Sequence, residues 1–178
     1  MITPKLIAAV VTPFSDEGVS VDASAIARLV AYLRRHELDG LYVGGSTGEA
    51  TYQDLAERRA VIEHFAQAAA GQMSLIAQVG GGSLMGAIEL GKAAKTAGYE
   101  AISSLPPMYY GHGFAAIKDF YQRLVDSVEL PLVIYNFPAA SGTELTAKQL
   151  QDLMAIPGVS GVKHTSLNLY QFERLLSK

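Results

Sequence analysis

The chain has 178 residues, of which 49% are hydrophobic and 17% are charged, and its formal net charge is −3 at pH 7. This balance favours a folded globular protein and excludes extended disorder, and the scattered Lys and Arg residues give no basic region for nucleic acid or anionic lipid. The absence of cysteine excludes a disulfide scaffold and thiolate chemistry. The first apolar run is too short to span a membrane and has no signal-peptide cleavage region, so we expect a cytoplasmic protein.

Six short apolar runs recur at intervals of roughly 25–35 residues, which is the size of a βα unit. Each run is continuous and is bounded by Gly, Pro or Ser, which is typical of strands covered on both faces, as in a parallel sheet. The runs predict strands within residues 6–14, 38–45, 74–81, 101–107, 130–138 and 158–166.

Amphipathic helical segments separate these runs. They are expected over about 22–36, 54–70, 83–97 and 114–128, with two more beginning at Thr146 and near Asn168. Two segments carry a capping box, from Thr51 to Asp54 and from Thr146 to Gln149, and Gly98 is a suitable C-cap for the third helix.

The strict alternation of strand and helix predicts an α/β fold. A doubly wound open sheet and a (β/α)8 barrel both remain open, although the first βα turn, TPFSDEGVS, has no dinucleotide fingerprint. Polar residues, Gly and Pro follow most of the strands, and functional residues at the C-terminal ends of many strands are typical of a (β/α)8 barrel. A closed barrel has eight units and about 250 residues, so we expect one catalytic domain over residues 1–178 that is truncated at its C-terminus. Three explanations remain open: a shortened gene, a second polypeptide that completes the barrel, or a sequence that covers only part of a longer chain.

The motif GGSTGEA follows the second predicted strand. Glycines allow close approach of the backbone to a ligand, and the hydroxyls of Ser46 and Thr47 with nearby N–H groups are suited to a carboxylate or phosphate. The alternative is an ordinary βα turn. The motif is not a P-loop, because it lacks the Gly-Lys-Ser/Thr sequence.

Tyr135 and Lys163 end the fifth strand and lie on the sixth, so in a barrel they belong to neighbouring strands and can face one cavity. Burial lowers the pKa of a lysine amine in general, and the free amine attacks a carbonyl to form a Schiff base. The alternatives are a core tyrosine and a lysine that reaches solvent at the sheet's end. His112 and His164 are expected to be solvated, and no set of residues has metal-ligand spacing.

GGSTGEA, YNFPAASG and GVKHTS, in this order after strands two, five and six, resemble the pyruvate-dependent class I aldolases. This family includes N-acetylneuraminate lyase and dihydrodipicolinate synthase, and the resemblance covers essentially the whole chain. It implies a (β/α)8 barrel that uses no cofactor or metal, acts on small-molecule substrates, namely pyruvate and 2-oxo sugar acids, and forms a homo-oligomer, usually a tetramer.

The resemblance also implies roles for individual residues. Lys163 forms the Schiff base, Tyr135 shuttles a proton, and Tyr109 assists the relay or comes from a neighbouring subunit, with Tyr110 a competitor for that role. The 2-oxo acid carboxylate is bound by Gly45, Ser46 and Thr47, and Thr165 touches the sugar-like part of the substrate.

Within the family, the synthases carry an Arg two residues after the Pro of YNxP, a position held here by Ala140. That Arg would bind a second carboxylate with a bidentate fork. Its absence, with GGSTGEA, KHTS and LNLYQFERL, makes the chain similar to the sialic acid lyases. We therefore expect reversible cleavage of N-acetylneuraminate to N-acetylmannosamine and pyruvate. The alternatives are another aldolase or dehydratase of the family, including dihydrodipicolinate synthase and 2-keto-3-deoxy sugar acid enzymes, an inactive remnant that only binds 2-oxo acids, and a nucleotide-binding domain, which fits worst.

Overall fold

The computed structural model describes residues 5–15 and 18–176, and these form two compact units. One unit comprises the chain up to Gln78 together with Glu89–Ala101, and the other comprises Val79–Ile88 together with the chain from Ile102. In both units the strands are parallel and follow one another in the sheet in their sequence order.

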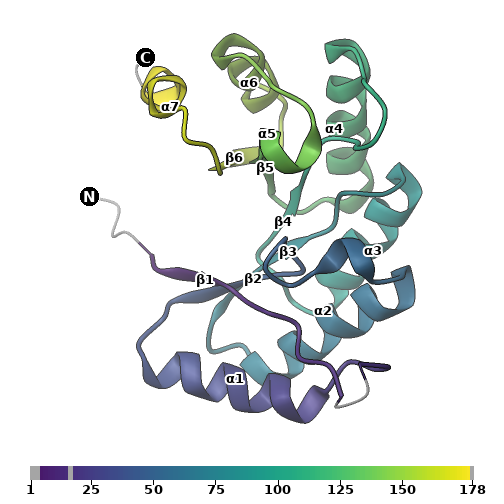
Figure 1. Cartoon of the computed structure of the whole chain (residues 1–178), viewed down its shortest axis with the longest axis vertical. Coiled ribbons are helices and arrows are strands. Elements are labelled where there is room, and N and C mark those ends of the chain that lie inside the picture. Colours follow the sequence, from purple (N-terminus) through teal and green to yellow (C-terminus); the bar gives the residue numbers. More distant parts are fainter. Residues whose placement is uncertain (1–4, 16–17, 177–178) are drawn as a thin grey trace. The chain divides into compact units, whose positions relative to one another are not determined.

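The first unit contains β1 (Ile7–Ala9), β2 (Gly40–Val43) and β3 (Ser74–Gln78). Helices α1 (Ala23–Arg35) and α2 (Leu55–Ala69) pack against each other on one side of these strands (Figure 1). The short 3-10 helix η1 (Ala50–Tyr52) precedes α2. All four residues of β2 are buried, which agrees with its prediction as a strand covered on both faces.

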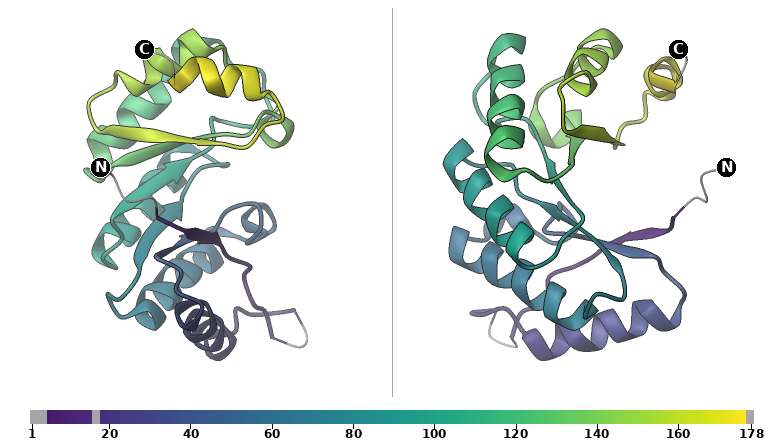
Figure 2. Two further views of the ribbon diagram at one scale, coloured as in Figure 1. Left: turned by 90° about the vertical axis from the view of Figure 1, so that its left-hand side faces the viewer. Right: turned by 180° about the vertical axis from the view of Figure 1, so that it is seen from behind.

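The second unit contains β4 (Ala101–Ser104), from Ile102 on, β5 (Leu132–Asn136) and β6 (Val159–His164). Figure 2 shows α4 (Phe114–Val128), α6 (Ala147–Met154) and α7 (Leu169–Leu176) on one side of β5 and β6. The amphipathic character predicted for 114–128 is confirmed in α4, since four apolar or aromatic side chains on it are buried: Ile117, Phe120, Tyr121 and Leu124. Helix α3 (Leu84–Thr96) divides between the two units.

All the predicted helices and strands occur, and the helix bounds agree to within about two residues, but β1, β3 and β4 end earlier than predicted. Two local features also differ. The capping box of α2 lies one turn later than predicted, because Asp54 is the N-cap and pairs with Glu57, whereas Thr51 lies in η1. A short helix, α5 (Pro138–Ser141), follows β5 and was not expected. The capping box of Thr146 with Gln149 is confirmed, and Gly98 follows α3 with φ +86°, the left-handed conformation in which glycine has no Cβ penalty.

Candidate active site

The pairing register of β5 and β6 sets which side chains face each other. Leu132 pairs with Val159, but the next pair is Val133 with Gly161, so Ser160 is an extra residue in β6. Such a β-bulge shifts every later residue of the strand by one position. Tyr135 therefore pairs with Lys163, and Asn136 pairs with His164.

Lys163 and Tyr135 lie in direct contact at the carboxyl ends of the two strands. The Nζ atom of Lys163 is 3.6 Å from the centroid of the Tyr135 ring, which is a cation–π geometry when the amine is charged. Tyr135 is 3% exposed and its ring stacks on Phe137. This proximity confirms the expectation, from adjacent strands, that the two side chains face the same space.

Thr165 completes this cluster, because Nζ of Lys163 donates a hydrogen bond to its Oγ1 at 3.2 Å. The backbone N–H of Thr165 donates to the carbonyl of Asn136 at 2.8 Å, which extends the β5–β6 pairing past the end of the strand. Three of the predicted site residues, Lys163, Tyr135 and Thr165, are thus brought together.

Lys163 is less buried than its sequence setting suggests. It is half-buried, like most of β6, whereas the flanking apolar residues predict a fully buried strand. The physical reason is that, over residues 5–15 and 18–176, the only strand with which β6 pairs is β5. His164 also differs from expectation, since it lies half-buried in β6, whereas His112 is exposed as expected.

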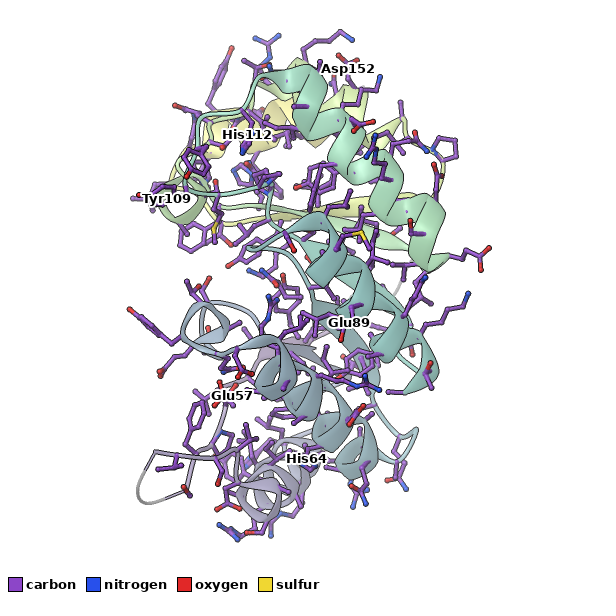
Figure 3. All side chains as sticks on the ribbon, turned by 90° about the vertical axis from the view of Figure 1, so that its right-hand side faces the viewer. Glu57, His64, Glu89, Tyr109, His112 and Asp152 are labelled. Carbon is purple, nitrogen blue, oxygen red and sulfur yellow. The ribbon has the colours of Figure 1, made fainter. Side chains whose placement is uncertain are left out.

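Tyr109 lies apart from this cluster, in the loop between β4 and α4. Its side chain is 91% exposed and meets the ring of Tyr110 edge-on, with 4.9 Å between the ring centroids. Figure 3 shows Tyr109 projecting from the loop. Its φ of +79° is an uncommon conformation for a residue with a Cβ, and such strain gathers at functional sites and contacts.

The residues Gly45, Ser46 and Thr47 belong to the first unit and follow β2. Gly45 is buried, and Ser46 and Thr47 are exposed. A tight turn forms here, in which the N–H of Gly48 donates to the carbonyl of Gly45 at 3.0 Å and the N–H of Glu49 donates to that of Ser46 at 3.1 Å. Ser46 and Thr47 thus lie at the exposed surface of this turn.

Two side chains for which the sequence predicted no site role, Thr12 and Gln53, hold this loop in place. The hydroxyl of Thr12 and the amide nitrogen of Gln53 both donate to the carbonyl of Gly48, each at 2.7 Å. Gln53 is 9% exposed. Thr12 is 36 residues from Gly48 in sequence, so only the tertiary structure reveals this contact.

Arg58 lies under the end of β3, where its guanidinium donates to the side-chain oxygen of Gln78 at 3.0 Å and to its carbonyl at 3.2 Å. Burial lowers the pKa of Arg58, and these polar contacts satisfy part of a cation that would otherwise be costly to bury. This role could not be predicted, because Arg58 is adjacent to a second arginine, Arg59, and no motif separates the two.

No group of three or more His, Cys, Asp or Glu side chains in the described part of the chain is arranged to hold a metal ion. Within the same residues, none of the helices combines the length and apolar character needed to cross a bilayer.

The parallel strands and the lysine–tyrosine pair at their carboxyl ends define an α/β protein with a candidate amine-nucleophile site. The chain belongs to the Dihydrodipicolinate synthetase family, which matches residues 3–178. It is 44% identical over 171 residues to the N-acetylneuraminate lyase of Salmonella paratyphi B, an alignment that covers 96% of this chain and 57% of the relative.

Solved structures agree with this membership. The structure of CdNal from Clostridium difficile in complex with mannosamine matches with a TM-score of 0.93 and 32% identity, over 98% of this chain and 60% of that one. A dihydrodipicolinate synthase from Acinetobacter baumannii complexed with pyruvate matches with a TM-score of 0.91 and 30% identity, over 97% and 59%. The predicted α/β fold of the (β/α)8 barrel family, with six βα units in this chain, is therefore confirmed. The chain spans less than two thirds of the length of these relatives.

Proposed function

We propose that this chain carries the Schiff-base centre of an N-acetylneuraminate lyase-like aldolase. The observation that carries the proposal is the contact between Nζ of Lys163 and the ring of Tyr135, 3.6 Å from its centroid. It is supported by the 44% identity to proteins named N-acetylneuraminate lyase and by the similar structures whose ligands are mannosamine and pyruvate.

In the proposed reaction, the unprotonated amine of Lys163 adds to the ketone carbon of the 2-oxo acid, and water leaves to give an iminium. The iminium accepts the electron pair of the carbon–carbon bond as it breaks, and Tyr135 accepts the proton of the hydroxyl that becomes the aldehyde. Tyr135 then returns this proton to the carbon of the resulting enamine, and water hydrolyses the iminium, which releases pyruvate and restores the amine. No cofactor or metal takes part.

The remaining residues keep the roles that their motifs imply. Gly45, Ser46 and Thr47 bind the carboxylate of the 2-oxo acid, and Thr165 contacts the polyol part of the substrate. Tyr109 supplies a hydroxyl to the proton relay at a subunit contact of a homo-oligomer, a role suited to its exposed, strained position. The oligomer is a tetramer in this proposal, and the protein acts in the cytoplasm.

We prefer a lyase activity over a synthase activity because α5 has no cationic side chain at the position where the synthase motif has an arginine. Ala140 is exposed there, and the two residues beside it are Ala139 and Ser141. A second carboxylate on the substrate would therefore lack the bidentate partner that an arginine provides.

The test is borohydride trapping with pyruvate, followed by intact mass measurement and peptide mapping. We expect one reduced pyruvate adduct, on Lys163, in the wild type and in Lys118→Met, which changes an exposed lysine of α4, and none in Lys163→Met. Release of pyruvate from N-acetylneuraminate is then measured against a panel of 2-keto-3-deoxy sugar acids and against aspartate semialdehyde condensation. A folded wild type without an adduct contradicts the Schiff-base proposal, and turnover of another substrate alone contradicts the lyase assignment.

A further inference from the structure

Asn136 and His164 form a second register pair, one residue beyond Tyr135 and Lys163. Because successive side chains of a strand point to opposite faces, this pair lies on the reverse side of the two strands from the lysine and the tyrosine. The amide Nδ2 of Asn136 is 2.9 Å from Nδ1 of His164, and Asn136 is 2% exposed. A side-chain hydrogen bond thus links the ends of β5 and β6 behind the candidate site.

The His164 ring has a second contact, on α7. It stacks on Phe172 with 5.4 Å between the ring centroids and 26° between the planes. Its Nε2 atom is buried and has no hydrogen-bond partner among the residues that the structure describes. With the Asn136 amide donating to Nδ1, the neutral ring carries its hydrogen on Nε2. His164 therefore depends on Asn136 for its one side-chain hydrogen bond, and on Phe172 for its orientation.

We infer that Asn136 and His164 are positioning residues for Lys163, an inference that rests on the proposed function. Lys163 is the residue before His164, so a link that fixes the His164 backbone against β5 also fixes the origin of the lysine side chain. The N–H of Thr165 donates to the carbonyl of Asn136 at 2.8 Å, so the same asparagine holds the strand by its backbone and by its side chain. Loss of the side-chain link lets the end of β6 separate from Tyr135.

The experiment compares four variants with wild type in borohydride trapping with pyruvate, measuring the maximum trapping rate and the pyruvate concentration at half-maximum. His164→Phe keeps an aromatic ring for stacking on Phe172 but removes the acceptor for Asn136. His164→Asn places an amide oxygen near the position of Nδ1, and His164→Gln places it one carbon farther out. His36→Phe, a change at an exposed histidine after α1, is the matched control.

We expect His164→Phe to lower the maximum rate by about tenfold to a hundredfold, the scale of a misplaced reacting group, with little change in the half-maximal concentration. His164→Asn restores the rate to within about threefold of wild type, His164→Gln does not, and His36→Phe matches wild type. Equal rates for the Asn and Gln variants overturn the inference even where the Phe variant fails to fold. So does a folded His164→Phe that traps at the wild-type rate. A wild type that forms no adduct contradicts the proposed function itself, which separates the two failures.

Discussion

Tyr135 and Lys163 are direct partners in the β5–β6 pairing, and the lysine nitrogen lies over the face of the tyrosine ring, 3.6 Å from its centroid. The ring face is the electron-rich part of a tyrosine, so it attracts an ammonium group without a hydrogen bond. The tyrosine hydroxyl is therefore not needed for this contact. The ring and the hydroxyl of Tyr135 can be tested separately.

Tyr135→Phe keeps the ring and removes the hydroxyl. We expect its free energy of unfolding to lie within about 1 kcal/mol of the wild-type value. It should still trap pyruvate, because the contact between the ring and Lys163 survives. Sugar-acid cleavage, which needs the proton acceptor, should fall by about a hundredfold or more. Tyr135→Leu, the companion variant, loses the ring as well and should be less stable than Tyr135→Phe by at least about 1 kcal/mol. Chemical denaturation and pyruvate release measure these effects, and undiminished cleavage by Tyr135→Phe would remove the tyrosine from the mechanism.

An alanine inserted between Gly161 and Val162 shifts the end of β6 by one residue. With this insertion, Val162 rather than Lys163 faces Tyr135, because a one-residue slip moves each side chain to the other face. We expect the insertion variant to lose pyruvate trapping by more than about tenfold. Ser160→Ala keeps the residue count and removes only the hydroxyl, which donates to the carbonyl of Leu132 at 3.3 Å, so it should trap normally. Trapping by the insertion variant at the wild-type rate would show that the register of β6 does not set the site.

Gly40→Ala tests the close approach of β2 and β3. A Cβ at Gly40 would lie 2.6 Å from the carbonyl oxygen of Ser74 and 2.9 Å from its Cβ, and the paired backbone leaves no flexible group to move aside. We expect a loss of about 1–3 kcal/mol in the free energy of unfolding. Gly82→Ala, at a position with nothing within 4 Å of the added atom, is the control and should be nearly neutral. Equal stability of the two variants in urea titrations would contradict the close contact.

Tyr99 predicts a pH dependence of stability. Its hydroxyl donates to the carbonyl of Ile62 at 2.9 Å, and burial raises its pKa far above the ordinary value of 10.0. The folded state therefore keeps this proton at a pH where the unfolded state loses it, so the contribution to stability is complete below pH 10 and declines above it. Between pH 10 and 11 the wild type should lose about 1 kcal/mol more than Tyr99→Phe.

The measurement is the difference between the urea unfolding free energies of wild type and Tyr99→Phe at each pH, since other groups titrate in both proteins. A difference that stays constant from pH 9 to pH 11 would contradict the raised pKa. Below pH 9 the variant should be less stable by about 1 kcal/mol, the usual value of one hydrogen bond.

The strands, the helices and their order could be predicted because each apolar run is flanked by turn residues and each helix has a regular stripe or a cap. The proximity of Tyr135 and Lys163 followed from the adjacency of parallel strands. The bulge at Ser160 could not be predicted, since one extra residue leaves no periodic signal. The link between Asn136 and His164 joins residues 28 positions apart, and it requires the pairing register that the bulge defines. The partial burial of β6 depends on how many strands pair with it, and an apolar sequence segment does not indicate that number.

The carbonyl of Gly48 accepts hydrogen bonds from both Thr12 and Gln53, and this has a thermodynamic consequence for the loop that carries Ser46 and Thr47. Thr12 comes from a distant segment and Gln53 from the end of the same loop, so the entropy of ordering the loop is lost when the protein folds. In the proposed function, the carboxylate of the 2-oxo acid meets a loop that is already ordered, so its binding immobilises few additional bonds. Binding there should be governed by the enthalpy of new hydrogen bonds and by desolvation, with little loss of backbone freedom.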